Sequence, residues 1–246
     1  MKKKIVAFTL VAVMLAIAIV GGSLAYFTDT DSAKNVMTIG SVEIEQIEQE
    51  RGEDGELQEF TQDKMLLPMG GDPAWAEELV TVNNDSFKVF DSENVIDKFV
   101  TVNNTGKSAA YVRTIVALEA GKSAEEANDL WYNYIALTDN SDGETITSED
   151  NDLYVEINGT YYIIVVYTYE EALESGAQSG ASLTGVALYK NATQEVVANL
   201  GETYEVLVLS QAVQASDMGD DAGAALDTAF GDVNAANVAE WFAPIA

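Results

Sequence analysis

The chain has 246 residues, with 12 Lys and Arg against 41 Asp and Glu, no His and no Cys, so its net charge is −29 and its pI is near 4.1. A surface this negative repels phosphate backbones and anionic headgroups, so we expect no nucleic acid and no anionic lipid among its partners. The absence of His and Cys excludes zinc and copper sites built on those ligands, Ser-His triads, cysteine nucleophiles and disulfides. A metal site would therefore use oxygen ligands, as calcium and magnesium sites do.

Apolar residues make up 48% of the chain and aromatic residues 9%, which is enough to form a core despite the charge. The length fits one large or two small domains, and all-β sandwiches of this size are often single units.

The N-terminus has the order of a secretory signal, and we expect residues 1–26 to be removed. Three lysines precede an uncharged run over residues 5–20, and small residues follow up to Ala25. Small side chains before the cut would place it after Ala25. The alternative is an uncleaved membrane anchor, because the uncharged stretch through Tyr26 is long enough to cross a bilayer as a helix.

Strand-like patterns begin at residues 35–47, where the first half is apolar on both faces and the second half alternates with charged residues. A strand that is apolar on both faces needs cover on both. Residues 48–64 are rich in charge and contain two glycines, which predicts a flexible loop.

The middle of the chain predicts further strands. Alternating β-branched residues indicate strands over 95–103 and 111–119, joined by residues 104–108 as a hairpin or as an arch between two sheets. Ser123 and Glu126 form a capping box, which predicts a short helix. Residues 132–138 are another strand candidate.

The clearest hairpin places Asn158-Gly159 between residues 153–157 and 160–169, because both turn residues tolerate the positive φ of a type I′ turn. The second of these strands is uncharged over residues 161–169 and would be an aggregation hazard on an open edge. We therefore expect it to be central and covered. Residues 182–189 and 203–213 complete the predicted strands.

Helical spacing returns at the C-terminus, over residues 222–229 and 233–242 with Gly231 between them. We expect these helices to pack on one end of a sandwich. About eight short strands with few helices predict an all-β fold, an antiparallel β-sandwich of the jelly-roll type.

The best candidate for a metal site is a stretch that resembles a calcium-binding loop. Aligned on Gly143, it places Asn140, Asp142 and Glu149 where oxygen ligands are needed, but Thr138 stands where an Asp is required. Calcium is therefore the one cofactor that the sequence suggests, and a solvated acidic turn is the alternative.

Two stretches near the N-terminus, residues 21–30 and 35–44, resemble the TasA/camelysin family of Gram-positive bacteria, whose members are exported by a dedicated signal peptidase, SipW. A looser resemblance extends over residues 100–113. The resemblance implies a jelly-roll subunit of an extracellular biofilm-matrix fibre. In that family the segment after the cleavage site becomes a donor strand that completes the sheet of the next subunit.

Carried over to this chain, the resemblance implies cleavage between Tyr26 and Phe27, one residue later than the small-residue estimate after Ala25. It divides the chain into a signal peptide (1–26), a donor-type segment (27–45) and a single jelly-roll-like domain with C-terminal helices (46–246). The donor strand would lie within Phe27–Ile39, and its expected residues are Phe27, Val36, Met37 and Ile39.

The residues themselves favour the same function. A strand that is apolar on both faces and lies at a new N-terminus is suited to β-augmentation of a neighbour's edge, and head-to-tail contacts that do not close generate filaments. The expected partners are other copies of this chain and, during export, the signal peptidase, with membrane contact only through the uncleaved signal. In the alternative, residues 35–47 pair within their own sheet, and the chain is a secreted or membrane-anchored monomeric binding module at the cell surface.

Camelysin-like relatives are described as metallopeptidases, but this chain has no His-Glu-x-x-His motif and no His at all. We therefore expect no enzyme and assign no catalytic residue. Without residues 1–26, which contain three lysines and no acid, the remaining 220 residues carry a net charge of −32. Because neighbouring subunits then repel one another, we expect mild acid or calcium to promote assembly, which light scattering would measure.

Overall fold

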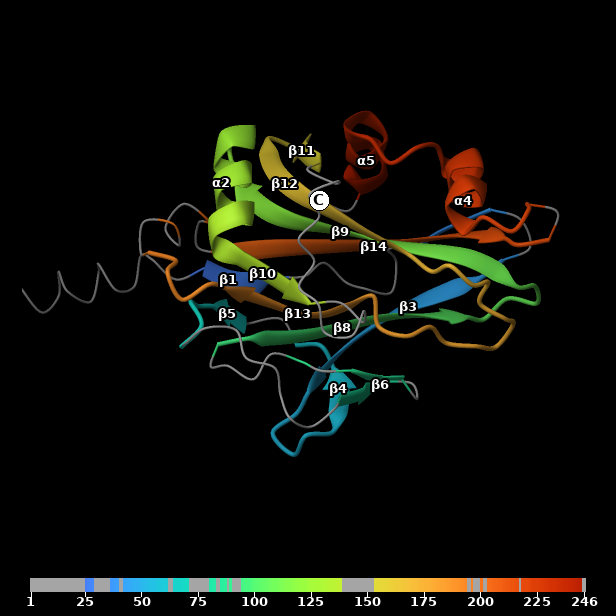
Figure 1. The fold of residues 1–246 in the computed structure, drawn as a ribbon, viewed down its shortest axis with the longest axis horizontal. Coiled ribbons are helices and arrows are strands. Elements are labelled where there is room, and N and C mark those ends of the chain that lie inside the picture. Colours follow the sequence, from blue (N-terminus) through green and yellow to red (C-terminus); the bar gives the residue numbers. More distant parts are fainter. Residues whose placement is uncertain are drawn as a thin grey trace, which may run out of the picture.

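The computed structural model places most of the chain in two packed β-sheets, with helices over one of them (Figure 1). It describes residues 25–28, 36–39, 42–61, 64–70, 80–82, 85–87, 89, 94–138, 153–193, 196, 200, 203–216 and 218–244. The expectation of an all-β fold built mainly of antiparallel strands is confirmed.

In the described part of the chain, the larger sheet has seven strands in the order β11-β12-β9-β14-β1-β5, with β2 also paired to β14. Their bounds are Ala25–Thr28 (β1), Val36–Ile39 (β2), Lys64–Leu66 (β5), Ala110–Gly121 (β9), Leu153–Ile157 (β11), Thr160–Thr168 (β12) and Thr203–Gln214 (β14). Most neighbours are antiparallel, but β1 and β2 both run parallel to β14.

The smaller sheet has five strands among the described residues, in the order β10-β13-β8-β3-β4. Their bounds are Ile44–Arg51 (β3), Leu57–Glu59 (β4), Ile96–Asn104 (β8), Ile135–Thr138 (β10) and Leu183–Leu188 (β13). Two short strands, β6 (Val80–Val82) and β7 (Asp85–Phe87), pair separately.

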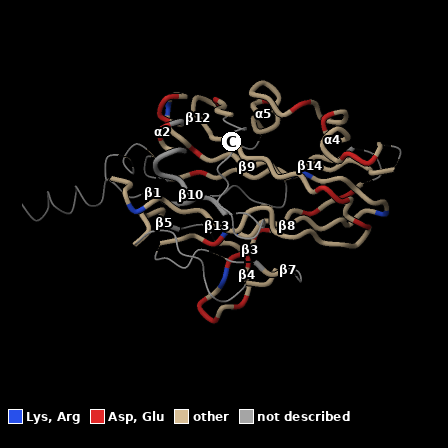
Figure 2. The backbone as a smooth tube through the Cα atoms, viewed as in Figure 1, with Lys and Arg blue, Asp and Glu red and all other residues tan. Residues whose placement is uncertain are grey.

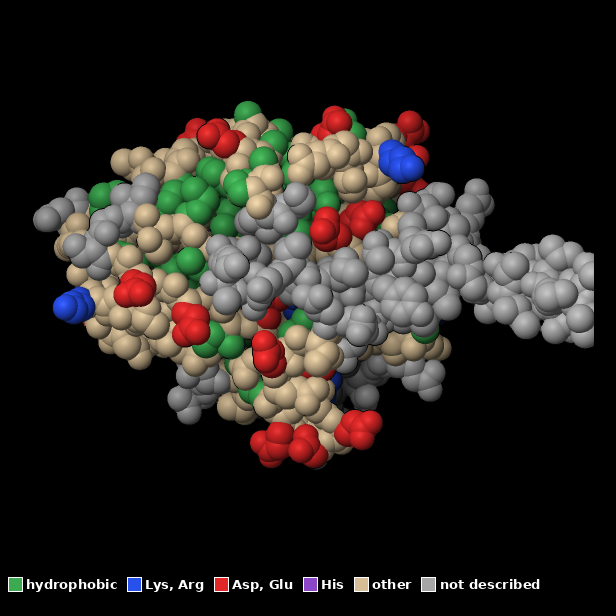
Figure 3. All heavy atoms as spheres, turned by 180° about the vertical axis from the view of Figure 1, so that it is seen from behind, with side chains coloured by type: hydrophobic (Ala, Val, Ile, Leu, Met, Phe, Trp, Pro, Cys, Tyr) green, Lys and Arg blue, Asp and Glu red, His purple; other side chains and the backbone are tan. Residues whose placement is uncertain are grey.

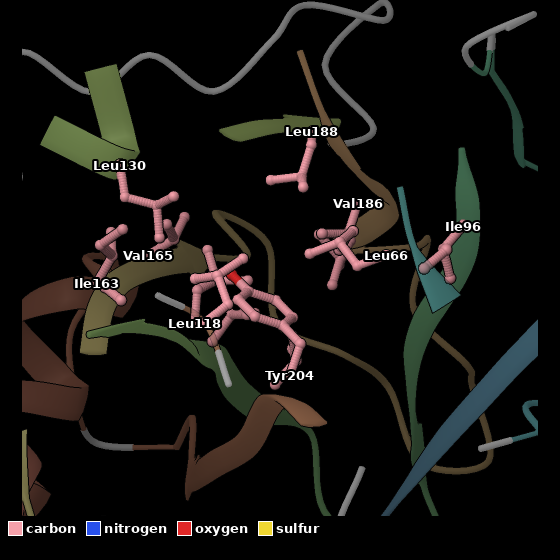
Figure 4. Packing of buried hydrophobic residues seen from close by; sticks show 14 of the residues in the cluster. Leu66, Ile96, Leu118, Leu130, Ile163, Val165, Val186, Leu188 and Tyr204 are labelled. Carbon is pink, nitrogen blue, oxygen red and sulfur yellow. The ribbon is translucent and has the colours of Figure 1, made fainter. Parts of the chain in front are cut away.

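The main hydrophobic core fills the space between the two sheets (Figure 4). Strand alternation sends every second residue of β9, β12 and β14 into this space, where they meet residues of β8 and β13. Figure 4 shows side chains from both sheets and from α2 pointing toward one another: Leu66, Ile96, Leu118, Leu130, Ile163, Val165, Val186, Leu188 and Tyr204.

Three helices lie in the described residues: α2 (Ala124–Tyr134), α4 (Ala222–Phe230) and α5 (Ala235–Phe242). The predicted C-terminal helices are present, but their expected position on one end of the sandwich is wrong. They lie over the outer face of the larger sheet, where α4 contacts β9 and β14 and α5 contacts β11 (Figure 1). The reason is that β9, β12 and β14 are apolar on both faces, so the outer face also needs cover.

The predicted turns are confirmed. Asn158 and Gly159 have φ values of 51° and 90° and join β11 to β12, as a type I′ hairpin requires. The connection between the strands predicted over 95–103 and 111–119 is an arch between two sheets rather than a hairpin. Residues 105–109 connect β8 in the smaller sheet to β9 in the larger one. Strand β12 is flanked by β11 and β9, which protects it although it lies next to the edge strand rather than at the centre.

Two strand predictions need correction at their ends. Residues 35–47 form two strands in different sheets, β2 and β3, rather than one, since the chain crosses between the sheets after Ile39. The strand predicted over residues 132–138 begins only at Ile135, because α2 continues to Tyr134 with no Gly or Pro to stop it.

The loop predicted over residues 48–64 is also wrong in its first part. Strand β3 continues to Arg51 and pairs with β4. Glu48 and Glu50 lie on the inward face of β3, where a half-buried strand usually carries apolar residues, and both are buried. Lys98 balances the charge of Glu48 inside the core, and Glu50 accepts hydrogen bonds from Gln58 and Thr61. Hydropathy shows neither of these interactions.

Candidate functional site

The N-terminal segment lies along one edge of β14, in the body of the larger sheet. Strand β1 places Phe27 opposite Tyr204 and Thr28 opposite Glu205, in parallel register. On its other side β1 pairs antiparallel with β5, with Ala25 opposite Leu66. The three residues expected at the cleavage site, Ala25, Tyr26 and Phe27, therefore all belong to one strand.

The second piece of the segment, β2, continues along the same edge of β14. Val36, Met37 and Ile39 stand opposite Ser210, Gln211 and Val213, respectively. Val36 packs against a cluster on the inner side of the sheet, and Met37 packs against the cluster under α5 on the outer side. The strand expected to be apolar on both faces is thus half-buried on both.

Strand β14 is the element that this segment covers. It is 12 residues long and carries one charge, Glu205. Its opposite edge is closed by β9 through a continuous antiparallel register from Val206 to Gln214. Without the N-terminal segment, a long edge of β14 with a single charged residue would present unpaired backbone groups, which is the condition that leads to pairing with another chain.

Arg113 organises the outer face beside this edge. It lies on β9 and is 2% exposed. Its Nε donates to Gln211 Oε1 at 2.7 Å, one terminal nitrogen donates to Asp227 at 2.6 Å, and the other donates to the Gly231 carbonyl at 3.1 Å. The guanidinium carbon also lies 5.2 Å from the centre of the Trp241 ring. One buried side chain thus connects the sheet with α4, α5 and the turn between them.

A second polar group connects β14 to the smaller sheet. Ser210 Oγ donates to Gln46 Oε1 at 2.7 Å, and Gln46 Nε2 donates to Glu48 at 2.7 Å. Glu48 also pairs with the buried Lys98, whose ammonium lies 4.1 Å from the centre of the Phe60 ring. Because these groups satisfy one another, the polar interior of β3 is stable in the core.

A pair of carboxylates lies at the other end of β14, next to β1. The Glu205 N–H donates to Glu119 Oε2 at 2.9 Å, and the Tyr162 hydroxyl donates to Glu205. Burial, and to a smaller extent the charge of Glu205, raises the pKa of Glu119 to about 7, although the hydrogen bond from the Glu205 N–H acts in the opposite direction. Burial and the hydrogen bond to Glu205 also raise the pKa of Tyr162.

The predicted calcium ligands Asn140, Asp142 and Glu149 lie outside the described residues. Within the described part of the chain, no group of three or more Asp and Glu is placed to hold a metal ion. A small hollow between α2 and the end of β9 is lined by Gly121, Glu126, Asp129 and apolar neighbours. Acidic residues occur along the whole described part of the chain, and basic residues are few (Figure 2).

The predicted signal lies largely in residues 1–24, which are outside the described part. No helix among the described residues combines the length and apolar character needed to cross a membrane. Comparison of the chain with protein-family models, with curated proteins and with solved structures finds no match.

Of the expected donor residues, Val36 and Met37 are brought onto the body of the fold by β2, and Phe27 and Ile39 are placed by backbone register on β14. Sequence reasoning did not find Arg113, Gln211 or Glu119, which complete the site. A signal was available for Arg113, since it is the single basic residue of β9 and lies in a largely apolar run. An isolated charge in such a strand indicates a buried partner.

Proposed function

We propose that the mature chain is a secreted structural subunit of the TasA/camelysin type, which assembles head-to-tail into an extracellular fibre. In this proposal, residues 27–39 leave their own β14 and pair with β14 of the next copy. The observation that supports this proposal most directly is the pairing of β1 and β2 with one edge of β14. Assembly is a structural role, and the proposal includes no catalytic step.

Exchange between copies preserves the contacts of the segment. Parallel pairing with β14 and the packing of Val36 and Met37 are the same whether the segment comes from the same chain or from a neighbour. Only residues 40–43 separate β2 from β3, which lies in the other sheet. A short connection at a chain end favours swapping, and a contact between two different surfaces gives an open filament rather than a closed dimer.

Signal removal supplies a reason for the segment to leave. Cleavage between Tyr26 and Phe27 removes Ala25 and Tyr26, which pair with Leu66 and Met65 of β5. It also removes one of the three residues that pair β1 with β14. The pairing of the segment with β5 and β14 of its own chain is therefore weakened only after export. Assembly inside the cell is disfavoured for this reason.

The finer topology belongs to the same proposal. We propose a jelly roll because successive parts of the chain alternate between the sheets: β8, β10 and β13 lie in the smaller sheet, whereas β9, β12 and β14 lie in the larger one. This alternation is typical of double-sheet jelly rolls. The site is proposed to work in the extracellular matrix or at the cell surface of a Gram-positive bacterium.

A cysteine pair tests the proposal, since the native chain has no Cys. Thr38 and Ala212 are register partners across the exchangeable edge, and Val112 and Ala212 are register partners across the β9 edge. Chains starting at Phe27 and carrying Thr38→Cys alone are mixed with chains carrying Ala212→Cys alone, and then oxidised. Filaments are followed by negative-stain electron microscopy.

We expect filaments and a disulfide-linked heterodimer between the Thr38→Cys and Ala212→Cys chains. The control mixture, Val112→Cys with Ala212→Cys, gives no heterodimer because those strands pair only within one chain. Absence of filaments, together with a Thr38→Cys/Ala212→Cys double variant that closes only within one chain, would overturn the proposal. The monomeric binding module would then be the better interpretation.

A further inference from the structure

We infer that Met37 is the residue by which β14 recognises an incoming strand, and that Arg113, Gln211 and the C-terminal helices form its receptor. This inference rests on the proposed function and names the part of that site that selects the donor. It gives α4 and α5 a role in strand selection in addition to covering the sheet.

The receptor is held by contacts that do not involve the incoming strand. Gln211 is fully buried on the outer face of β14, and its Oε1 accepts a hydrogen bond from Arg113 Nε at 2.7 Å. Because Arg113 uses the carbonyl oxygen, the amide nitrogen of Gln211 must point toward the donor strand. It lies 3.6 Å from Met37 Sδ. Arg113 is itself held by Asp227 and the Gly231 carbonyl, so the orientation of Gln211 depends on α4 and the turn that follows it.

The surroundings of Met37 are apolar. Met37 packs against a cluster whose fully or largely buried helix residues are Val238, Trp241 and Phe242. Hydrophobic side chains also gather on the upper half of the rear face, the half that carries α4 and α5 (Figure 3). A thioether suits these surroundings because it is unbranched, apolar and able to accept a weak hydrogen bond.

A positive charge at position 37 does not suit these surroundings. The ammonium of a lysine would meet the donor nitrogen of Gln211, because the Gln211 oxygen is turned toward Arg113. Thr38, the next residue, is exposed. Met37→Lys and Thr38→Lys therefore make the same change in net charge, and only the first places it in the receptor.

The experiment uses the chain starting at Phe27 in four forms: wild type, Met37→Lys, Thr38→Lys and the double variant Met37→Lys/Gln211→Glu. Filaments are scored by negative-stain electron microscopy, and hydrogen exchange of the peptide over residues 36–39 is followed by mass spectrometry. The exchange measurement reports pairing of β2 whether it is within a chain or between chains. In the double variant, the carboxylate introduced at position 211 still accepts from Arg113 and also accepts from the ammonium introduced at position 37.

We expect Met37→Lys to lose filaments and to exchange the β2 amides about tenfold faster. Thr38→Lys is expected to resemble wild type, and the double variant to recover both properties. A Met37→Lys chain whose β2 is protected like that of wild type would overturn the inference, as would a double variant with no recovery. If wild type forms no filaments but Met37→Lys still loses protection, the proposed function fails and the receptor for Met37 remains.

Discussion

The two edges of β14 are paired in different ways. Along one edge, β9 makes an unbroken antiparallel ladder of nine residue pairs. Along the other, β1 and β2 make parallel pairs in two pieces, of three and four residues. One strand thus has one long, continuous partner and one short, interrupted partner, which are the permanent edge and the replaceable edge of the proposed assembly. The difference arises from register length and continuity rather than from composition.

The side chains follow the same division. Val112 on β9 and Val36 on β2 pack in the same inner cluster, but Val112 is fully buried whereas Val36 is half-buried. The β9 edge is further secured by Arg113, which crosses from β9 to β14 and to the helices. Because β9 is buried on both faces and Arg113 links it to β14, the β9 edge belongs to the core of the fold.

The largest effect is expected from Arg113→Met, which breaks the permanent edge. Loss of the guanidinium removes three hydrogen bonds and leaves the buried Gln211 oxygen without its donor. We expect the free energy of unfolding to fall by about 3 kcal/mol, measured by urea denaturation. Arg51→Met is the control, because the Arg51 side chain is 34% exposed in its pair with Asp97 and its loss should cost less than about 1 kcal/mol. Equal losses in the two variants would contradict the special role of Arg113.

A matched pair of Val→Ala substitutions compares the two edges directly. Val112→Ala leaves a cavity in a closed part of the core and should destabilise the chain by about 2 kcal/mol. Val36→Ala, in the same cluster, should cost less than about 1 kcal/mol but slow filament growth, which light scattering would follow. A Val36→Ala cost as large as that of Val112→Ala would show that the N-terminal edge is equally permanent.

The permanent edge could be predicted from the sequence better than the replaceable one. Strands β9 and β14 contain long β-branched and apolar runs, and the hairpin at Asn158-Gly159 has a local signal. The parallel pairing of β2 with β14 joins residues that are more than 170 positions apart, and no local pattern encodes it. The two apolar faces predict a strand near residues 36–39, and the resemblance implies a donor role for it, but neither identifies β14 as its partner strand.

The polar parts of the site were missed for a related reason. Gln211, Glu48 and Glu119 occupy strand positions where hydropathy alone predicts solvent or a loop. Each is stabilised by a partner on another strand, such as Arg113 or Lys98, which only the fold brings close. Isolated polar residues inside apolar runs are a signal for such pairs, but they do not identify the partner.

The smallest expected effect concerns the carboxylate pair at the β1 end of the site, where Glu119 on β9 contacts Glu205 on β14. Burial raises the pKa of Glu119 from an unfolded value of 4.5 to about 7 in the folded chain. Between these values the native state binds the proton more tightly than the unfolded chain does. The stabilisation from this proton is therefore complete below pH 4.5 and is lost as the pH rises through 7.

Glu119→Gln keeps a neutral group in place at every pH, so it should remove this part of the pH dependence. After allowance for the partial exposure of Glu119, we expect the variant to be more stable than wild type by about 1–2 kcal/mol at pH 8 and nearly equal to it at low pH, measured by thermal and urea unfolding. Glu156→Gln, on the exposed face of β11, removes the same charge and serves as the control. Parallel pH profiles for wild type and Glu119→Gln would contradict the assignment. Since Glu205 is the register partner of Thr28, a difference confined to Glu119→Gln would place the contact that weakens with rising pH at the end of β14 where the proposed donor segment begins.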